Sequence, residues 1–63
     1  MIKFELWTDH YVALNPRHIT SVETNERGDG SIIRMFNGDQ WAARDMPMAV
    51  VSAIVQWLED NER

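Results

Sequence analysis

The last quarter of the chain carries its longest hydrophobic pattern of helical period. The apolar residues recur at i, i+1, i+4 and i+8, and a tryptophan widens the stripe: Val50, Val51, Ile54, Leu58 and Trp57. This spacing predicts an amphipathic helix over residues 47–58. We expect Asp45 to act as its N-cap, and Pro47 suits the first turn because an N–H would be unpaired there anyway.

Short runs of strand character precede this helix. Residues 2–7 alternate apolar and polar side chains with period two, which is typical of a half-buried strand. Residues 11–14 form a second β-prone run that Asn15-Pro16 ends, because proline has no N–H for a ladder. A tight turn or a single helical turn is expected next. Residues 19–26 predict a third strand, whose odd apolar spacing suggests either a bulge or that Ile19 belongs to the preceding turn.

Asn37-Gly38 marks a hairpin between residues 31–36 and residues 39–43. Asn-Gly is the strongest short hairpin signal, because a two-residue type I′ loop needs positive φ at both positions. A loop of two residues sets the pairing register of the two strands. This register places Arg34 opposite Trp41 on one face of the sheet.

These elements predict a single domain of the α+β class. We expect a small antiparallel β-meander of about four or five strands, covered on one face by the single C-terminal helix. Ala42 is small enough to let the helix approach. The sheet residues expected to face the helix are Ile2, Phe4, Leu6, Val12, Leu14, Val22, Ile33 and Met35.

The other sheet face is then unusually apolar for a surface that only meets water. It is expected to carry Trp7, Ile32, Arg34, Phe36 and Trp41. Aromatic residues and arginine are enriched in protein interfaces, so this face predicts a partner-binding surface of an accessory or regulatory protein. Self-association as a homodimer is one form of this prediction. The alternatives are that loops cover the rings, or that the two faces are reversed.

The charge pattern offers a second hypothesis. The net charge is -4, and the six basic residues are scattered singly, which argues against a nucleic-acid groove. Four carboxylates stand out as candidate contacts for a basic partner: Glu23, Glu59, Asp60 and Glu62. The chain could therefore be an inhibitor from a phage or mobile element that imitates phosphate, as an anti-CRISPR-like protein would. An ordinary solvated acidic surface is the alternative.

Residues for catalysis or metal binding do not form a recognisable set. There is no cysteine, and His10 and His18 lie in two different predicted turns. No serine has a neighbouring base, and no glycine-rich loop precedes a helix. We expect no enzymatic activity, cofactor, metal or small-molecule substrate. The chain shows no signal-peptide pattern and no apolar run of membrane-spanning length, which predicts a cytoplasmic protein without membrane contact.

Several segments together resemble the small flagellar motility proteins of the FlbD/SwrD family. The matching residues are Met1-Ile2, Val12 to Asn15, Ile19, Val22-Glu23, Ile33, Met35, Asn37-Gly38, Trp41, Val50-Val51 and Ile54. The resemblance implies a β-meander with a C-terminal helix, no enzymatic activity, and a cytoplasmic accessory role in bacterial motility. The chain departs from the family in its three tryptophans and in Asp39-Gln40, where the family tends to be basic.

Overall fold

The computed structural model describes residues 1–62 and confirms the predicted fold class. Five strands, one short 3-10 helix and one α-helix follow each other in the order β1 (Ile2–Glu5), β2 (Tyr11–Leu14), η1 (Pro16–His18), β3 (Ile19–Thr24), β4 (Ser31–Met35), β5 (Gln40–Ala43) and α1 (Pro47–Asp60). All strand pairs are antiparallel. Within the described residues, no helix is long and apolar enough to cross a membrane.

The strands form two sheets that meet at one corner. β1 pairs with β2, while β3, β4 and β5 form the second sheet in that order. The chain just after β1 joins the end of β5 through an isolated bridge between Leu6 and Ala43. The amide of Arg44 also donates to the carbonyl of Glu5 at 3.0 Å. This corner brings residues 5–9 beside residues 42–44, although they are far apart in the sequence.

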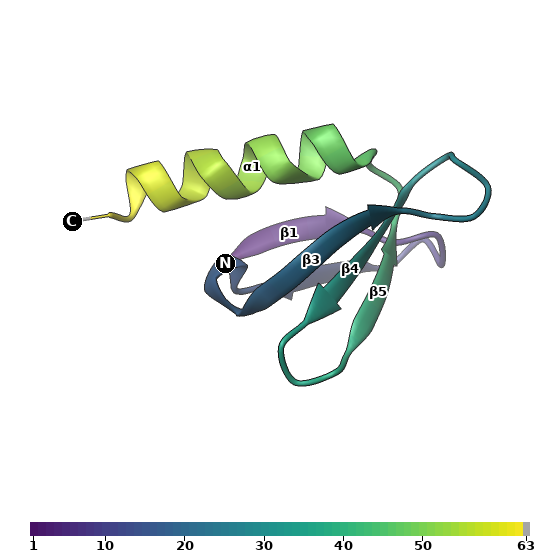
Figure 1. The fold of residues 1–63 in the computed structure, drawn as a ribbon, viewed down its shortest axis with the longest axis horizontal. Helices are drawn as coiled ribbons and strands as arrows, with labels where there is room; N and C mark the ends of the chain where they lie inside the picture. Colours follow the sequence, from purple (N-terminus) through teal and green to yellow (C-terminus); the bar gives the residue numbers. More distant parts are fainter. Residues whose placement is uncertain (63) are drawn as a thin grey trace.

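The helix α1 lies along one side of the sheets, next to β1 and β3 (Figure 1). On the side of α1 that faces the sheets, Val50 is fully buried and Ile54 packs against the same core. Val51 is 47% exposed, so its prediction as a packing residue is wrong. Neighbouring helix residues point about 100° apart, and the line that faces the sheet runs through Val50 and Ile54 instead. The buried apolar residues are Phe4, Leu14, Ile33, Ala43 and Val50.

The start of α1 also differs from its prediction. Met46, in extended conformation, is the N-cap, and the amide of Val50 donates to its carbonyl at 3.1 Å. Asp45 is not the cap: its carbonyl instead accepts the hydroxyl of buried Ser31 at 2.6 Å. A buried hydroxyl needs a hydrogen-bond partner. This bond holds Asp45 in the position just before the N-cap, outside the helix. Pro47 opens the helix as predicted.

Two local predictions before the hairpin are confirmed. The link between β2 and β3 is the single helical turn η1, whose first amides are capped by Asn15. The Asn15 side chain accepts from the amide of Arg17 at 3.0 Å. The register of β3 against β4 shifts between Ile19 and Ser21, which is the expected bulge.

The register of the β4–β5 hairpin is one residue away from its prediction. Arg34 lies opposite Gln40, and Ile33 opposite Trp41. The loop has three residues rather than two: Gly38 donates to the carbonyl of Met35 at 3.0 Å, and Met35 donates to that of Asp39 at 2.8 Å. Only Gly38 in this loop has positive φ, at 97°. Shifting a strand by one residue exchanges its faces, so Trp41 turns toward the core.

Candidate functional site

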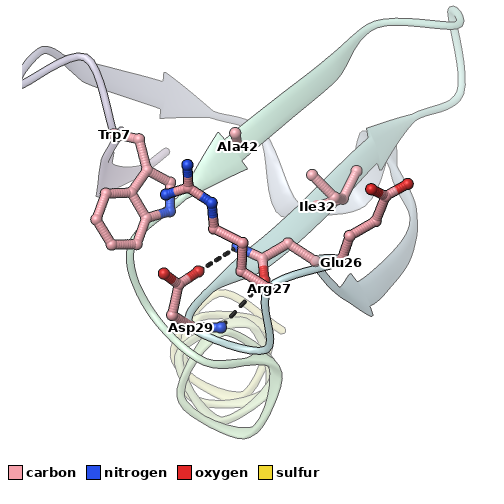
Figure 2. Close-up of a pocket in the computed structure, with 7 residues that line it drawn as sticks. Trp7, Glu26, Arg27, Asp29, Ile32 and Ala42 are labelled. Atoms are coloured by element: carbon pink, nitrogen blue, oxygen red, sulfur yellow. Dashed lines mark hydrogen bonds between the residues drawn. The ribbon is translucent and has the colours of Figure 1, made fainter.

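A shallow hollow of about 360 Å³ lies on the sheet face that points away from α1. Ile33 and Ala43 are buried in the core with Val50. Their sequence neighbours Ile32 and Ala42 therefore point to the opposite face, because side chains alternate along a strand. Figure 2 shows the residues around the hollow, which are Trp7, Asn25, Glu26, Arg27, Asp29, Ile32 and Ala42.

The floor of the hollow is apolar. Ile32 and Ala42 lie directly opposite each other on β4 and β5, so they form one cross-strand pair. Trp7 stands at one side of this pair and is 39% exposed. Its amide donates to the carbonyl of Ala42 at 3.3 Å, which anchors the tryptophan backbone to β5. The large ring is thus presented to solvent by a fixed main chain.

Trp7 owes its position to the turn between β1 and β2. The amide of Leu6 donates to the carbonyl of His10 at 2.8 Å, and that of Asp9 donates to Leu6 at 3.1 Å. Trp7 is therefore the first residue of a three-residue loop. Asp9 closes this loop with a φ of 64°, the left-handed region that aspartate tolerates better than most residues. The turn lifts Trp7 away from the β1 ladder and toward β5.

The guanidinium of Arg44 holds the indole from a second direction. It lies over the Trp7 ring at 4.7 Å, in cation–π geometry. The same group donates to the carbonyl of Leu6 at 3.2 Å and to the carboxylate of Asp9 at 2.6 Å. Glu5 completes the cluster at 3.9 Å. One arginine from the end of β5 therefore ties the turn and its aromatic side chain together.

The loop between β3 and β4 forms the opposite rim. The Asn25 side chain donates to the carboxylate of Asp29 at 2.8 Å and accepts from the Asp29 amide at 3.1 Å. The Asn25 amide also donates to the carbonyl of Gly30 at 3.1 Å. Arg27 extends from this loop toward the indole of Trp7 in Figure 2. The polar contacts around Asn25 keep the rim in a defined shape.

The rim is more acidic than basic. Glu26 and Asp29 are set against Arg27 alone. A second hollow of about 400 Å³ continues over the same face and shares Asn25, Glu26 and Ile32 with the first. There Glu23 and Arg34 form an ion pair and largely neutralise each other. The combined surface is an apolar floor beside Trp7 with a net negative border.

The predicted aromatic face is therefore brought together only in part. Trp7 and Ile32 meet at the hollow, and Arg34 lies in its continuation. Phe36 is 73% exposed and packs edge-on against His18, with ring centres 5.3 Å apart, at the tip of the β4–β5 hairpin. Trp41 packs against the core, and among the described residues its indole N–H is buried without a hydrogen-bond partner. The expected placement of Arg34 opposite Trp41 on one face is wrong, because the register pairs Arg34 with Gln40.

Sequence reasoning missed most of the border. Ala42 was expected to lie under the helix, but the register shift turns it to the open face. Arg44 and Asp29 gain their roles from contacts across the corner and within a loop, which no periodic pattern signals. The Gly28-Asp29-Gly30 run was a visible hint, because a glycine-rich loop allows close backbone approach.

The four predicted acidic contacts do not form one patch. Glu23 lies on the open sheet face with Arg34. Glu59 and Glu62 line a hollow of about 350 Å³ at the end of α1, beside Arg17. The carboxylate of Asp60 accepts from the Gln56 side chain at 3.1 Å. A phosphate-like row of charges would have to come from the helix end alone.

The two histidines serve local contacts. His10 Nδ1 lies 3.3 Å from the hydroxyl of Thr8, and His18 packs against Phe36. Among residues 1–62, no group of three His, Asp or Glu side chains is arranged to hold a metal ion. Comparison of the chain with known protein families, curated proteins and solved structures gives no match.

Proposed function

We propose that this chain is a small non-enzymatic interaction module that binds a protein partner through the hollow beside Trp7. The observation that carries the proposal is the tryptophan itself. Its ring remains 39% exposed although a turn, a strand contact and the Arg44 guanidinium all fix its position. Exposing a rigid aromatic side chain next to an apolar floor favours binding, because little side-chain entropy is then lost on association.

The border of the hollow supports a particular class of partner segment. The floor of Ile32 and Ala42 suits one apolar side chain, and Glu26 and Asp29 suit lysine or arginine beside it. The proposed ligand is therefore a short basic segment of a protein with a single apolar anchor. The hollow is small, so the affinity expected for such a segment is modest.

A random peptide library displayed on phage tests this proposal. We expect the immobilised chain to select peptides in which an apolar residue is flanked by basic ones. Trp7→Ala should abolish their binding, whereas Phe36→Ala should leave it unchanged because Phe36 lies outside the hollow. Circular dichroism must show both variants folded. Peptides that bind Trp7→Ala and the parent equally well would refute the site.

The competing proposal is an acidic inhibitor that occupies the basic groove of a nucleic-acid-binding protein. It is supported by the exposed carboxylates of Glu59, Asp60 and Glu62 at the end of α1. This proposal predicts that Glu59→Lys weakens partner binding while Trp7→Ala does not. Binding should also weaken steeply with salt, because the contact would be between exposed charges.

The resemblance to the FlbD/SwrD family suggests where the module works. On that basis we propose a cytoplasmic accessory protein of bacterial motility. The absence of cysteine is compatible with a reducing compartment. Deleting the gene and measuring swimming on soft agar tests this role: the prediction is reduced spreading, restored by the parent chain but not by Trp7→Ala.

A further inference from the structure

We propose that α1 pairs with α1 of a second copy of this chain, in antiparallel orientation, through an apolar stripe that the fold leaves uncovered. The stripe consists of Met48, Val51, Val55 and Leu58. Met48 is 83% exposed, while Val51 and Val55 are each 47% exposed. Leu58 is half-buried at the end of the same line. This surface is separate from the hollow proposed above to bind a partner.

The position of the stripe on the helix shows that the monomer does not need it. Its members follow at i, i+3, i+7 and i+10, which is one continuous line along a helix. The side of α1 that faces the sheet is already formed by Val50 and Ile54. Exposed valine has no local advantage either, because β-branched residues are weak helix formers. We therefore expect this stripe to pack against a surface of another molecule.

The stripe is self-complementary when two copies run in opposite directions. With the midpoint at residue 53, Val51 of one copy faces Val55 of the other, and Met48 faces Leu58. A twofold axis makes every such contact occur twice, as in the isologous interfaces of most dimers. The central part of the stripe contains only uncharged side chains, and Ser52 and Gln56 flank it. No like charges therefore meet at the middle of the pair.

The charges at the helix ends favour this orientation over a parallel pair, with exposed Asp45 just before the first turn as the one acidic side chain near the opposing helix end. α1 has no acidic residue in its first turn and no basic residue in its last turn. Within the described residues, no side chain caps its start at Met46. Glu59 and Asp60 thus lie at the end where the helix dipole disfavours negative charge. In the antiparallel pair, Glu59 lies near the first turn of the other helix, where free N–H groups donate to its carboxylate. A parallel pair would instead bring the acidic ends together.

The pair leaves the proposed binding surface accessible. α1 covers the core face of the sheet, whereas the Trp7 hollow opens on the opposite face. A dimer through the helices therefore presents two hollows at once. Two linked sites raise the effective affinity for a partner with repeated segments, without any new contact.

Light scattering over a wide range of concentration tests the pairing. We expect the parent mass to rise from 7.4 kDa toward twice that value. Val55→Glu should remain a monomer at concentrations at least tenfold above the parent midpoint, because it places two charges at the centre of the pair. Gln56→Glu is the matched control: it adds the same charge one residue away, about 100° round the helix, and should dimerise like the parent.

Cysteine crosslinking tests the orientation and does not depend on the glutamate variant. The chain has no cysteine of its own. An oxidised mixture of Val51→Cys and Val55→Cys should form the mixed disulfide at least tenfold faster than either variant forms its own. A disulfide requires Cα atoms within about 7 Å, which the antiparallel pair provides only between positions 51 and 55. Preferred 51–51 and 55–55 links would overturn the orientation.

The pairing proposal and the partner proposal can fail separately. A parent chain that stays monomeric at every concentration, with no crosslinking of the cysteine variants, would overturn the helix pair. Peptide binding by the Trp7 hollow would be unaffected by that result. Conversely, a dimer that binds no selected peptide would overturn the proposed function and leave the pair intact. If Val55→Glu fails to fold, Val51→Ser provides the same comparison with a smaller change.

Discussion

Replacing Gly30 with alanine tests the close approach on which the Trp7 site depends. Gly30 is buried where the β3–β4 loop enters β4. A Cβ atom added there would lie 2.4 Å from the carbonyl oxygen of Ala43 and 2.9 Å from the indole nitrogen of Trp7. The Ala43 oxygen belongs to the backbone of β5 and cannot rotate away. Either β5 or the loop must therefore move.

The expected loss of stability is large for a domain of this size. Overpacking of this kind costs roughly 1–3 kcal/mol, and a backbone clash places Gly30→Ala near the upper end, at about 3 kcal/mol. A chain of 63 residues is expected to have a free energy of unfolding of about 3–9 kcal/mol. The variant would thus lose a third or more of its stability. Displacement of Trp7 should also make the ring more accessible to iodide quenching.

Gly28→Ala is the matched control in the same loop. An added Cβ would meet nothing within 4 Å there, but φ is 77°, a region that costs alanine about 1 kcal/mol. Urea unfolding followed by tryptophan fluorescence should give a midpoint shift of about 2–3 M for Gly30→Ala and about 1 M for Gly28→Ala. An equal or smaller shift for Gly30→Ala would refute the steric argument.

Three further predictions concern the core and the support of Trp7. In urea titrations at a concentration where the chain is monomeric, Val50→Ala should lower the free energy of unfolding by about 2 kcal/mol, whereas Val51→Ala should change it by less than ~0.5 kcal/mol, because only Val50 is fully buried. In thermal unfolding, Trp41→Phe should change stability by less than about 1 kcal/mol, because the loss of packing with the smaller ring is offset by removal of a buried N–H that has no partner. Trp41→Ala should cost about 3 kcal/mol. Arg44→Gln should cost about 1 kcal/mol, because its ion pairs are partly exposed, and should increase iodide quenching of Trp7 in a chain whose other tryptophans are replaced by phenylalanine.

The order and type of the elements follow from signals that act locally. Proline at positions 16 and 47 marks the starts of η1 and α1, because its fixed φ suits the first turn and its missing N–H is not needed there. The bulge in β3 follows from apolar residues at odd spacing. These features depend on a few neighbouring residues, so the sequence alone predicts them well.

The hairpin register depends on whether a two-residue or a three-residue loop is the more stable, and the sequence does not show which. Asn37-Gly38 is compatible with a two-residue loop and with a three-residue loop that needs positive φ only at the glycine. The two loops differ by one residue in register, which decides whether Trp41 faces the core or the solvent. The three-residue loop packs this large ring against the core. Tertiary burial thus decides between two turns that are locally acceptable.

That same shift explains why the candidate site was predicted only in part. Alternation along residues 2–7 predicts Trp7 on the open face, and Trp7 lies there, although the β1–β2 turn and the contact with β5 set its position. Ala42 and Trp41 were exchanged between faces because both assignments rested on the register. Arg44 is 37 positions from Trp7 in the sequence, and their contact depends on the corner between β1 and β5.

The strained residue beside Trp7 links the fold to the proposed interaction. Each hairpin loop places its third residue in the left-handed region, and the β3–β4 and β4–β5 loops use glycine there. The β1–β2 loop uses Asp9, at a cost of about 1 kcal/mol in backbone strain. Glycine would remove the strain but also the carboxylate that holds Arg44 at 2.6 Å. Arg44 in turn lies over the Trp7 ring. The backbone strain at Asp9 is therefore the cost of holding the exposed indole in a fixed position. A binding surface needs this rigidity, whereas a stable fold does not.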